Sequence, residues 1–447
     1  MYDAIVIGAG VSGLMCANIM SRMGAHVLVL EKEPKTGGML QGFSRGGTAF
    51  DTGLHYVGGL GPGESLEWIF RYHNLTALPW KRLDCGEEVI IEGNSYLIPC
   101  GYDNFAEGMA EYFPHQRENL KHFVSELKSV SGGIRDLEKD RLPLYERSAA
   151  EFLEETISDE TLRKVLTSMG PRMEMRTESL PFYEYAMITA PFIESAWRLN
   201  APSHTITDVL AEQVVKHGGE IKCGIGVDSI AQNEVRSKDQ IFKAEEIISS
   251  IPPANMMPMV RQMRDIYKKR IISLPQTGGM FTAYLLLSPG MIPYVNHNIS
   301  IDNKVFVHFN VPEDQQNWAT TLEIMMPVEE WPQTRSEDYF SWKADLAERA
   351  IAIAETRFPG LARAVKEIYT SSPLTWQRYT GSASAFGIRK DYRSVLTTVL
   401  SPRTPLPHLW LIGQSIGLHG VLGVSMTVLN TLSQIYGLET IKKELSL

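Results

Sequence analysis

The sequence predicts an α/β fold in which a doubly wound parallel sheet is assembled from both ends of the chain and carries an inserted α+β domain. Three observations predict this fold. An apolar run, a glycine-rich turn and a helix-period stretch open the chain, a similar series closes it, and strand-like runs typical of an antiparallel sheet lie between them. With 447 residues the chain is long enough for two or three domains.

Composition places the chain among ordinary globular proteins. Hydrophobic residues make up 44% and charged residues 21%, which excludes the disordered, collagen-like and coiled-coil classes. The formal net charge of −9 has the wrong sign for a protein that holds phosphate backbones by charge. We therefore expect no nucleic-acid partner.

The cysteines and the first residues of the chain predict in which cellular compartment the protein lies. The cysteines form neither a CxxC pair nor a Cys/His cluster, so we expect no metal site and no disulfide framework. The few residues before the first strand-like run are too short for a secretory signal, and no run approaches the roughly 20 apolar residues of a membrane span. We expect a cytoplasmic protein. The cysteines are Cys16, Cys85, Cys100 and Cys223.

The first 31 residues predict a Rossmann-like βαβ unit. Residues 4–7 and 26–30 are strand-like runs, and helix-period spacing lies between them. The turn Gly8-Ala9-Gly10-Val11-Ser12-Gly13 is a GxGxxG motif, which lets backbone N–H groups and the positive end of the helix approach a pyrophosphate. Glu31 ends the second strand, where a carboxylate accepts both hydroxyls of an adenosine ribose. The unit predicts a dinucleotide ligand.

The rest of the chain divides between this domain and a second one. Helical segments and one hairpin, residues 89–98 turning at Gly93-Asn94, follow the first domain. Strand-like runs near residues 221–249 return to it, antiparallel runs follow, and a last strand and helix end the chain. We predict a discontinuous dinucleotide-binding domain of residues 1–75, 200–255 and 400–447, and a substrate domain of residues 76–199 and 256–399.

Several motifs resemble those of known flavoproteins. Gly37-Gly38, just past Glu31, is similar to the hallmark of flavoproteins with two dinucleotide-binding domains. The segment Phe50-Asp51-Thr52-Gly53-Leu54-His55-Tyr56-Val57-Gly58 resembles that of retinol saturases and related bacterial members of the phytoene desaturase superfamily, which includes carotenoid isomerases. The resemblance extends over the chain, because further matching segments are residues 376–381, 385–388, 411–415 and 418–424.

The resemblance implies a noncovalently bound FAD and a hydrophobic small-molecule or lipid substrate, such as a conjugated polyene or another isoprenoid. It implies an oxidoreductase that desaturates or saturates carbon–carbon double bonds by hydride exchange with the flavin, with NAD(P)H as the candidate electron donor. Carried over by position, the cofactor-binding residues are Gly8, Gly10, Val11, Ser12, Gly13, Glu31, Lys32, Gly38, Met39, Leu40, Leu54, His55, Val227, Gly413, Gln414, Gly423 and Val424.

Several positions depart from the pattern of the relatives, and one of these departures is the segment Asn200-Ala201-Pro202, where relatives often show a Gly-Gly turn. Met39 stands where many carry Arg, and Gly42 stands where Ser or Thr is frequent. Gln414 replaces an acidic residue, so the ribityl chain of the flavin would meet a neutral amide. These departures leave the subfamily and the direction of the reaction open.

His55 and His419 are the candidate catalytic residues. The resemblance places both near the flavin ring, and imidazole exchanges a proton near neutral pH. The alternative for each is that it only packs against the cofactor or bonds to the backbone.

Residues 180–199 are rich in aromatic and apolar side chains. They favour either a buried core or a lipid-facing surface with peripheral membrane contact. Pro191 is expected to break a continuous helix in this stretch.

Three other functions remain open from the sequence. A flavin-dependent carotenoid cis–trans isomerase would cause no net redox change. An amine-oxidase-like flavoprotein would share the FAD fold, and a flavin-containing binding protein would have lost turnover. The sequence does not predict the oligomeric state.

Overall fold

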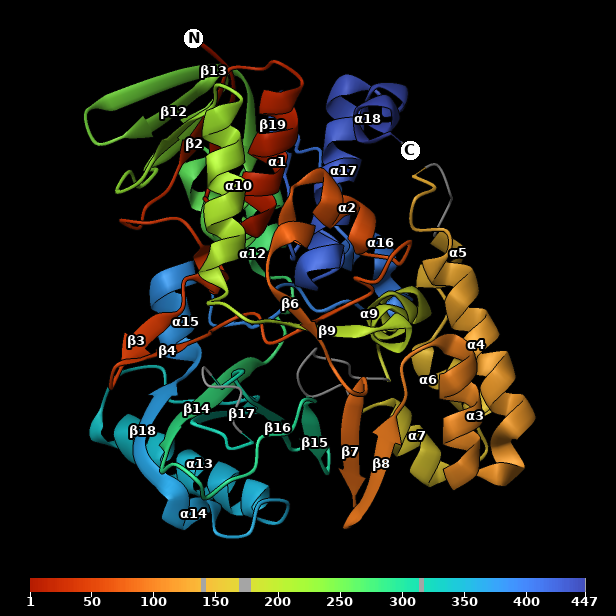
Figure 1. Ribbon diagram of the computed structural model, residues 1–447. Helices are drawn as coiled ribbons and strands as arrows, with labels where there is room; N and C mark the ends of the chain where they lie inside the picture. The colour runs from red at the N-terminus through yellow and green to blue at the C-terminus, as the bar shows by residue number, and fades with distance from the viewer. Residues whose placement is uncertain (138–141, 169–177, 313–316, 447) are drawn as a thin grey trace.

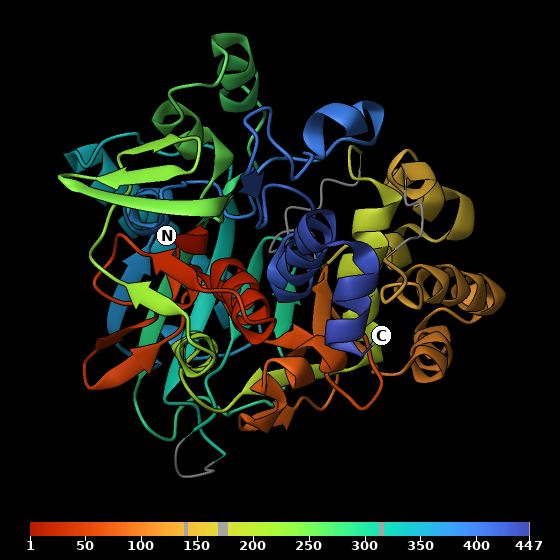
Figure 2. The ribbon, with the colours of Figure 1, turned by 90° about the horizontal axis from the view of Figure 1, so that it is seen from above.

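The computed structural model describes residues 1–137, 142–168, 178–312 and 317–446. Two larger sheets organise it: one occupies the upper part of Figure 1 and the other the lower left, with a group of helices at the lower right. Both chain termini lie in the upper part. Figure 2 shows the upper part from above, where helices from the two ends of the chain lie side by side.

The first sheet has a parallel core in the strand order β10-β2-β1-β13-β19. β2 and most of β1 are buried apolar runs, as expected for parallel strands that are covered on both faces. β13 is longer and continues into an antiparallel meander with β12 and β11. The strands are β1 (Tyr2–Ile7), β2 (Val27–Leu30), β10 (Glu220–Lys222), β11 (Ser229–Ala231), β12 (Glu234–Ser237), β13 (Gln240–Ser249) and β19 (Leu409–Leu411).

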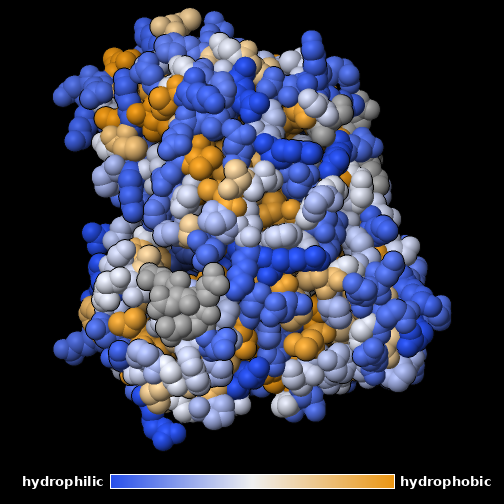
Figure 3. Space-filling view, in the orientation of Figure 1, coloured by the Kyte–Doolittle hydropathy of each residue, from blue (hydrophilic) through white to orange (hydrophobic). Residues whose placement is uncertain are grey.

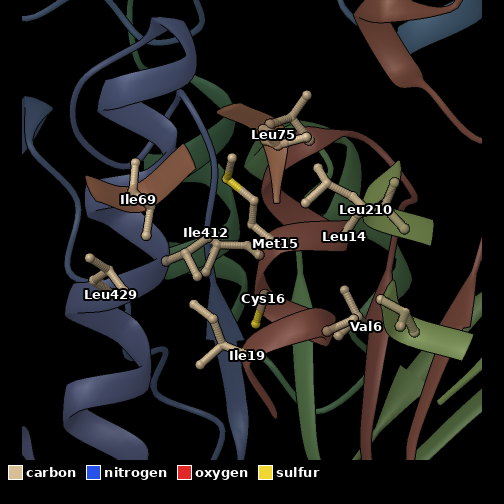
Figure 4. Packing of buried hydrophobic residues seen from close by; sticks show 14 of the residues in the cluster. Val6, Leu14, Met15, Cys16, Ile19, Ile69, Leu75, Leu210, Ile412 and Leu429 are labelled. Atoms are coloured by element: carbon tan, nitrogen blue, oxygen red, sulfur yellow. The ribbon is translucent and has the colours of Figure 1, made fainter. Parts of the chain in front are cut away.

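Helices from distant parts of the sequence pack together beside the first sheet. α1 lies at the centre of this cluster and contacts both α10 and α17. Figure 4 shows Met15 of α1, Leu210 of α10 and Leu429 of α17 among the buried side chains. Both ends of the chain are therefore needed for one core. The helices are α1 (Val11–Arg22), α2 (Glu67–Tyr72), α10 (His204–Lys216), α17 (Gly420–Tyr436) and α18 (Leu438–Leu445).

Part of the predicted substrate domain packs into the core of the first sheet. Met256, Met257 and Ile271 are buried against Ile230 and Val235 of the meander. The packing of the first domain thus extends beyond the predicted boundary after residue 255, because these side chains supply apolar cover for the sheet. They belong to or adjoin α11 (Pro253–Met256), the 3₁₀ helix η4 (Met257–Met259) and α12 (Asp265–Ile272).

The second sheet has the order β18-β14-β17-β16-β15-β7-β8 and is mostly antiparallel. The hairpin of β7 and β8 forms as predicted, but it turns at Glu92-Gly93 rather than Gly93-Asn94, and both turn residues have positive φ. It joins the sheet through a parallel pairing of β7 with β15. The strands are β7 (Glu87–Ile91), β8 (Asn94–Ile98), β14 (Gly279–Leu287), β15 (Ile299–Ile301), β16 (Val305–His308), β17 (Thr321–Val328) and β18 (Val365–Ser371).

Alternation along these strands separates two faces of the second sheet. One face carries Phe281, Leu285 and Ile324, which pack in one cluster with side chains of α13 (Glu337–Glu355) and α14 (Leu361–Ala364). The opposite face carries Met280 and Met325 and is turned toward the first domain. The site described below lies between that face and the first sheet.

The remaining helices form a separate apolar cluster around α9. The expectation that Pro191 breaks this helix is wrong: α9 continues through it to Glu194. Pro191 lies in the last turn, so its missing N–H removes one late hydrogen bond, and burial of nearly the whole helix offsets that loss. The helices are α3 (Tyr102–Tyr112), α4 (Arg117–Ser131), α5 (Leu142–Tyr145), α6 (Ala149–Thr156), α7 (Glu160–Leu166) and α9 (Phe182–Glu194).

Short elements connect these parts. The small sheet β5-β9-β6 joins the segment after residue 57 to the end of α9, and the hairpin of β3 and β4 packs Phe43 and Phe50 against Tyr284 of the second sheet. The bounds are β3 (Phe43–Arg45), β4 (Thr48–Phe50), β5 (Val57–Gly58), β6 (Trp80–Arg82), β9 (Ala196–Leu199), α15 (Pro373–Thr380), α16 (Val395–Thr398), and the 3₁₀ helices η1 (Gly38–Leu40), η2 (Leu75–Ala77), η3 (Pro114–Gln116) and η5 (Tyr392–Ser394).

In the described part of the chain, no helix has the length and hydropathy needed to cross a bilayer. The apolar stretch of residues 180–199 is mostly buried, largely within the helical cluster around α9. On the face shown in Figure 3, hydrophobic residues occur in small groups among hydrophilic ones.

Candidate functional site

A cavity of about 470 Å³ lies between the first sheet and the second. Its floor is formed where strands of the first sheet end: Gly8 follows β1, Glu31 follows β2, and Gly413 comes shortly after β19. Ligands of doubly wound sheets bind at this edge, outside the carboxyl ends of the strands. The opposite wall comes from the second sheet and α9.

The glycine turn at the start of α1 forms a cradle. Gly8 has φ of +99°, which favours glycine, and Gly10 is the N-cap of α1. A Cβ built on Gly10 would come no closer than 3.9 Å to another atom, the Cα of Gly38, so the turn leaves space at the helix N-terminus. This arrangement of backbone N–H groups and positive helix end fits a pyrophosphate.

Gly13 has a different place from the other predicted cofactor-binding residues. It is not among the residues that line the cavity. A Cβ built on Gly13 would lie 2.0 Å from the carbonyl oxygen of Gly8, so this glycine allows α1 to pack closely on the turn after β1. The structure therefore assigns it to packing rather than to contact with a ligand.

Glu31 lies at the cavity edge and is 6% exposed. Its carboxylate accepts hydrogen bonds from the backbone N–H groups of Ala9, at 2.7 Å, and Glu33, at 2.9 Å. These bonds fix the carboxylate beside the glycine turn, and each oxygen keeps acceptor capacity for a hydroxyl. The position fits the ribose of a dinucleotide.

Two loops complete the cradle around Glu31. The backbone N–H of Ile225 donates to the Glu31 carbonyl at 2.8 Å, which brings Val227 to the cavity wall. On the other side, the N–H of Gly37 donates to the Ala9 carbonyl at 2.9 Å, and Gly38 has φ of +56°. Close approach of these backbones to the glycine turn requires small residues.

The C-terminal motif borders the same cavity. Gly413 has φ of +100°, and its N–H donates to Oγ1 of Thr427 at 3.0 Å. The side-chain amide of Gln414 donates to the Ala385 carbonyl at 3.3 Å. A Cβ on Gly423 would come within 2.6 Å of the Leu418 backbone, so this glycine lets α17 pack against the preceding loop.

The structure thus brings the predicted cofactor-binding residues together from five parts of the sequence. Of the predicted cofactor-binding residues, those that line the cavity are Gly8, Gly10, Val11, Ser12, Glu31, Lys32, Gly38, Met39, Leu40, Leu54, His55, Val227, Gly413, Gln414, Gly423 and Val424.

Beyond the cradle the cavity wall is apolar. The Tyr56 ring lies 4.4 Å from the Phe192 ring and 6.2 Å from the Phe306 ring, measured between centroids. Met280 and Met325 of the second sheet extend this wall. No sequence motif marks Met280 and Met325, and only the two-residue period of β14 and β17 puts them on one face of the sheet. Such a wall suits an apolar ligand.

His55 lies at this wall and is paired with a carboxylate that no sequence motif indicates. Its Nδ1 is 3.2 Å from Oε2 of Glu323, which is fully buried, whereas His55 is 11% exposed. Burial raises the pKa of the Glu323 carboxyl, and the His55 imidazole opposes that rise. The only signal in the sequence is a single acidic residue within the apolar run of β17.

A chain of buried polar groups continues behind Glu323. His308 lies directly opposite Glu323 across β16 and β17, and its ring is 4.9 Å from that of His55. Nδ1 of His308 is 3.1 Å from Oδ1 of Asn298, which accepts a hydrogen bond from Arg198 at 2.7 Å. Burial lowers the pKa of Arg198, and the Glu323 carboxylate is among the groups that oppose this. These polar groups lie beside the His55–Glu323 pair.

His419, the second candidate catalytic residue, also lines the cavity. It is the N-cap of α17, and its ring lies 4.8 Å from that of Phe386. Burial and the charge of Lys390 lower the pKa of His419 to about 4, so the imidazole is neutral at pH 7. Both predicted histidines therefore reach the cavity, but only His55 is paired with a carboxylate in the described part of the chain.

Among the described residues, no group of His, Cys, Asp and Glu is arranged to hold a metal ion. The cradle fits a dinucleotide, since glycines leave the space, Glu31 supplies an acceptor and α1 supplies a helix N-terminus.

Comparison with known proteins gives a matching domain family and similar proteins. Residues 6–72 match the model of an NAD(P)-binding Rossmann-like domain. The chain is similar to all-trans-retinol 13,14-reductase from Macaca fascicularis, with 23% identity over 94% of this chain and 83% of that protein. It is also similar to chloroplastic prolycopene isomerase 2 from an Oncidium hybrid, with 32% identity over 32% of this chain and 25% of that protein.

The fold is found in solved structures. An oxidoreductase from Methanosarcina mazei superposes with a TM-score of 0.69 and 18% identity, over 96% of this chain and 99% of that one. At this identity the likeness shows the fold alone.

Proposed function

Because the chain belongs to the superfamily of phytoene desaturases, carotenoid isomerases and retinol saturases, we propose that it is an FAD-dependent oxidoreductase acting on a carbon–carbon double bond of a polyene or isoprenoid lipid. The observation that carries the proposal is the continuity of the glycine cradle with an apolar wall that holds one carboxylate-paired histidine. The reductase name of the relatives that match most of the chain favours saturation of the double bond.

FAD, when bound, supplies hydride transfer to or from a substrate carbon at its isoalloxazine ring. The residues of the chain would bind the cofactor and the substrate and hold them in position for that chemistry. The turn from Gly8 to Gly10 would hold the pyrophosphate and Glu31 the ribose. Tyr56, Phe192 and the facing sheet residues would exclude water from an apolar substrate.

We assign the proton transfer to His55. Saturation of a double bond adds a hydride to one carbon and a proton to the other, whereas desaturation removes both. Since Nδ1 of His55 faces Glu323, Nε2 is the ring nitrogen left to exchange a proton with the substrate carbon. The buried Glu323 side chain, 3.2 Å from Nδ1, orients the ring.

The purified protein, reconstituted with FAD, tests the proposal. We expect flavin absorbance bands that bleach on anaerobic addition of dithionite, and we propose NADPH as a donor that bleaches them too. The reduced protein is then incubated with all-trans-retinol and, separately, with a cis-carotenoid. A product two hydrogens heavier supports saturation; failure to bind FAD would overturn the proposal.

A carotenoid isomerase is the second candidate function, favoured by the similarity to prolycopene isomerase. It predicts a product of unchanged mass with altered double-bond geometry. The same incubation distinguishes the two, because mass spectrometry reports the hydrogens and chromatography reports the isomer. Release of hydrogen peroxide with amines, and no reaction with polyenes, would instead support an amine oxidase.

A further inference from the structure

A second, smaller cavity of about 10 Å³ lies behind the wall of the main one. Phe386 and His419 line both cavities, so these two side chains separate them. Glu184 of α9 and Lys390 also line the smaller cavity. The group has no counterpart in the sequence motifs, since Glu184 and Lys390 are distant in the chain and neither belongs to a glycine-rich segment.

Lys390 is a buried cation held in a fixed position. It is 6% exposed, and its Nζ donates hydrogen bonds to the carbonyl oxygens of Ser415, at 2.9 Å, and Thr398, at 3.0 Å. Ser415 directly follows Gly413 and Gln414, which line the main cavity. The ammonium group is therefore attached to the same loop that borders the dinucleotide cradle.

Glu184 is the anion that compensates this charge. It is 3% exposed, and its Oε1 has no hydrogen-bond partner among the described residues. Burial raises the pKa of Glu184 and lowers the pKa of Lys390, and each charge opposes the shift of the other. The two charges therefore interact within the small cavity that both side chains line.

The field of this pair reaches the main cavity. Burial lowers the pKa of His419, and the positive charge of Lys390 lowers it further. His419 is the N-cap of α17 and lies on the cavity wall. The other charged group at the small cavity is Arg389, which pairs with Glu329 at 3.7 Å. At the N-terminus of α17 the helix dipole adds to the positive potential.

We propose that the buried Lys390–Glu184 pair sets the reduction potential of a flavin bound in the main cavity. Lys390 stabilises the reduced, more negative form of the ring system, and Glu184 moderates that effect. This inference rests on the proposed function. Lys390 and Glu184 do not line the main cavity, so they act through the potential at the wall formed by His419.

Opposite substitutions test the proposal. Lys390→Met removes the cation and is expected to make the flavin harder to reduce, so that the reduced fraction at a fixed redox poise falls below that of the wild type. Glu184→Gln removes the anion and is expected to raise that fraction. In the double variant Lys390→Met/Glu184→Gln both charges are gone, and the fraction returns toward the wild-type value.

The double variant also protects the test against loss of stability, because removing one partner of a buried pair leaves an uncompensated charge. Thermal unfolding is measured for all variants, and only folded, FAD-loaded proteins are compared by equilibration with a redox dye of known potential. A purely structural role would not move the single variants in opposite directions. Equal reduced fractions in all four proteins would overturn the inference while leaving the proposed function intact.

A second readout needs no flavin. In the apoprotein, NMR titration of the His419 imidazole is expected to show a higher pKa in Lys390→Met than in the wild type, because the neighbouring positive charge is gone. An unchanged His419 titration would show that the charge does not reach the cavity wall, and would overturn the inference independently of cofactor binding.

Discussion

Replacing each of two glycines of the same turn by alanine should separate folding from cofactor binding. A Cβ at position 13 would lie 2.0 Å from the Gly8 carbonyl oxygen, where atoms do not approach within 3.0 Å. In Gly13→Ala, α1 must therefore move away from the turn after β1 by about 1 Å in a closely packed core. We expect a loss of about 1–3 kcal/mol in the free energy of unfolding.

Gly10→Ala is the matched variant. Gly10 has φ of −78°, which alanine adopts without strain, and its Cβ would be 3.9 Å from the nearest atom. The apoprotein should be as stable as the wild type or gain about 0.4–1 kcal/mol, because alanine restricts the unfolded chain. The added methyl group would, however, occupy the cradle at the N-terminus of α1. We expect FAD binding to weaken at least tenfold.

The assays are urea unfolding of the apoproteins, followed by circular dichroism, and titration with FAD, followed by the change in flavin fluorescence. Gly24→Ala is a control for general effects of alanine at a turn, since a Cβ there meets no atom within 4 Å but the φ of +92° strains it. The reasoning is refuted if Gly13→Ala unfolds like the wild type, or if Gly10→Ala binds FAD with wild-type affinity.

Three further predictions concern acid stability, the proton and the apolar wall. Burial lowers the pKa of His73 to about 3, below the ordinary value near 6.5. The unfolded chain therefore binds a proton at His73 more strongly than the folded chain does. The free energy of unfolding should fall as the pH falls from about 6.5 toward 3. At pH 5 this loss is about 2 kcal/mol; urea unfolding should show a weaker pH dependence in His73→Leu. Glu323→Gln keeps the volume but removes the charge beside His55, so turnover should fall about 10²-fold while FAD titration stays unchanged, since Glu323 does not line the cavity. Equal turnover would contradict the role assigned to the pair. Phe192→Ala opens the wall beside Tyr56, and steady-state kinetics should show a KM for the polyene about tenfold higher with little change in FAD affinity; an unchanged KM would place the substrate elsewhere.

The dinucleotide cradle could be predicted from the sequence because its signals are local. The turn from Gly8 to Gly13 joins a strand to a helix, and Glu31 follows the next strand, so spacing alone brings them to one edge of a parallel sheet. The roles within the motif could not be separated in the same way. Gly10 leaves space at the cavity, whereas Gly13 packs against a carbonyl, and only the distances show that difference.

The polar partners of the site were decided by the tertiary structure. Glu323 lies in the middle of an apolar strand, and nothing in its neighbours along the chain indicates that it faces His55, more than 260 positions earlier. The pairing of Glu184 with Lys390 depends likewise on a helix and a loop that meet only after folding. Pro191 likewise shows that local sequence is not decisive. Proline disfavours a continuous helix, but burial of α9 outweighs that preference.

The sequence by itself therefore determined the dinucleotide-binding motif, the Rossmann-like start and the resemblance at both ends of the chain, because backbone conformation and hydrophobic period are properties of short segments. The tertiary structure decided which sheet faces form the apolar wall, which carboxylate pairs with His55 and where buried charges meet. Burial and Coulomb interactions depend on distances through space. Residues that are far apart in the chain therefore contribute to them as much as neighbours in the sequence do.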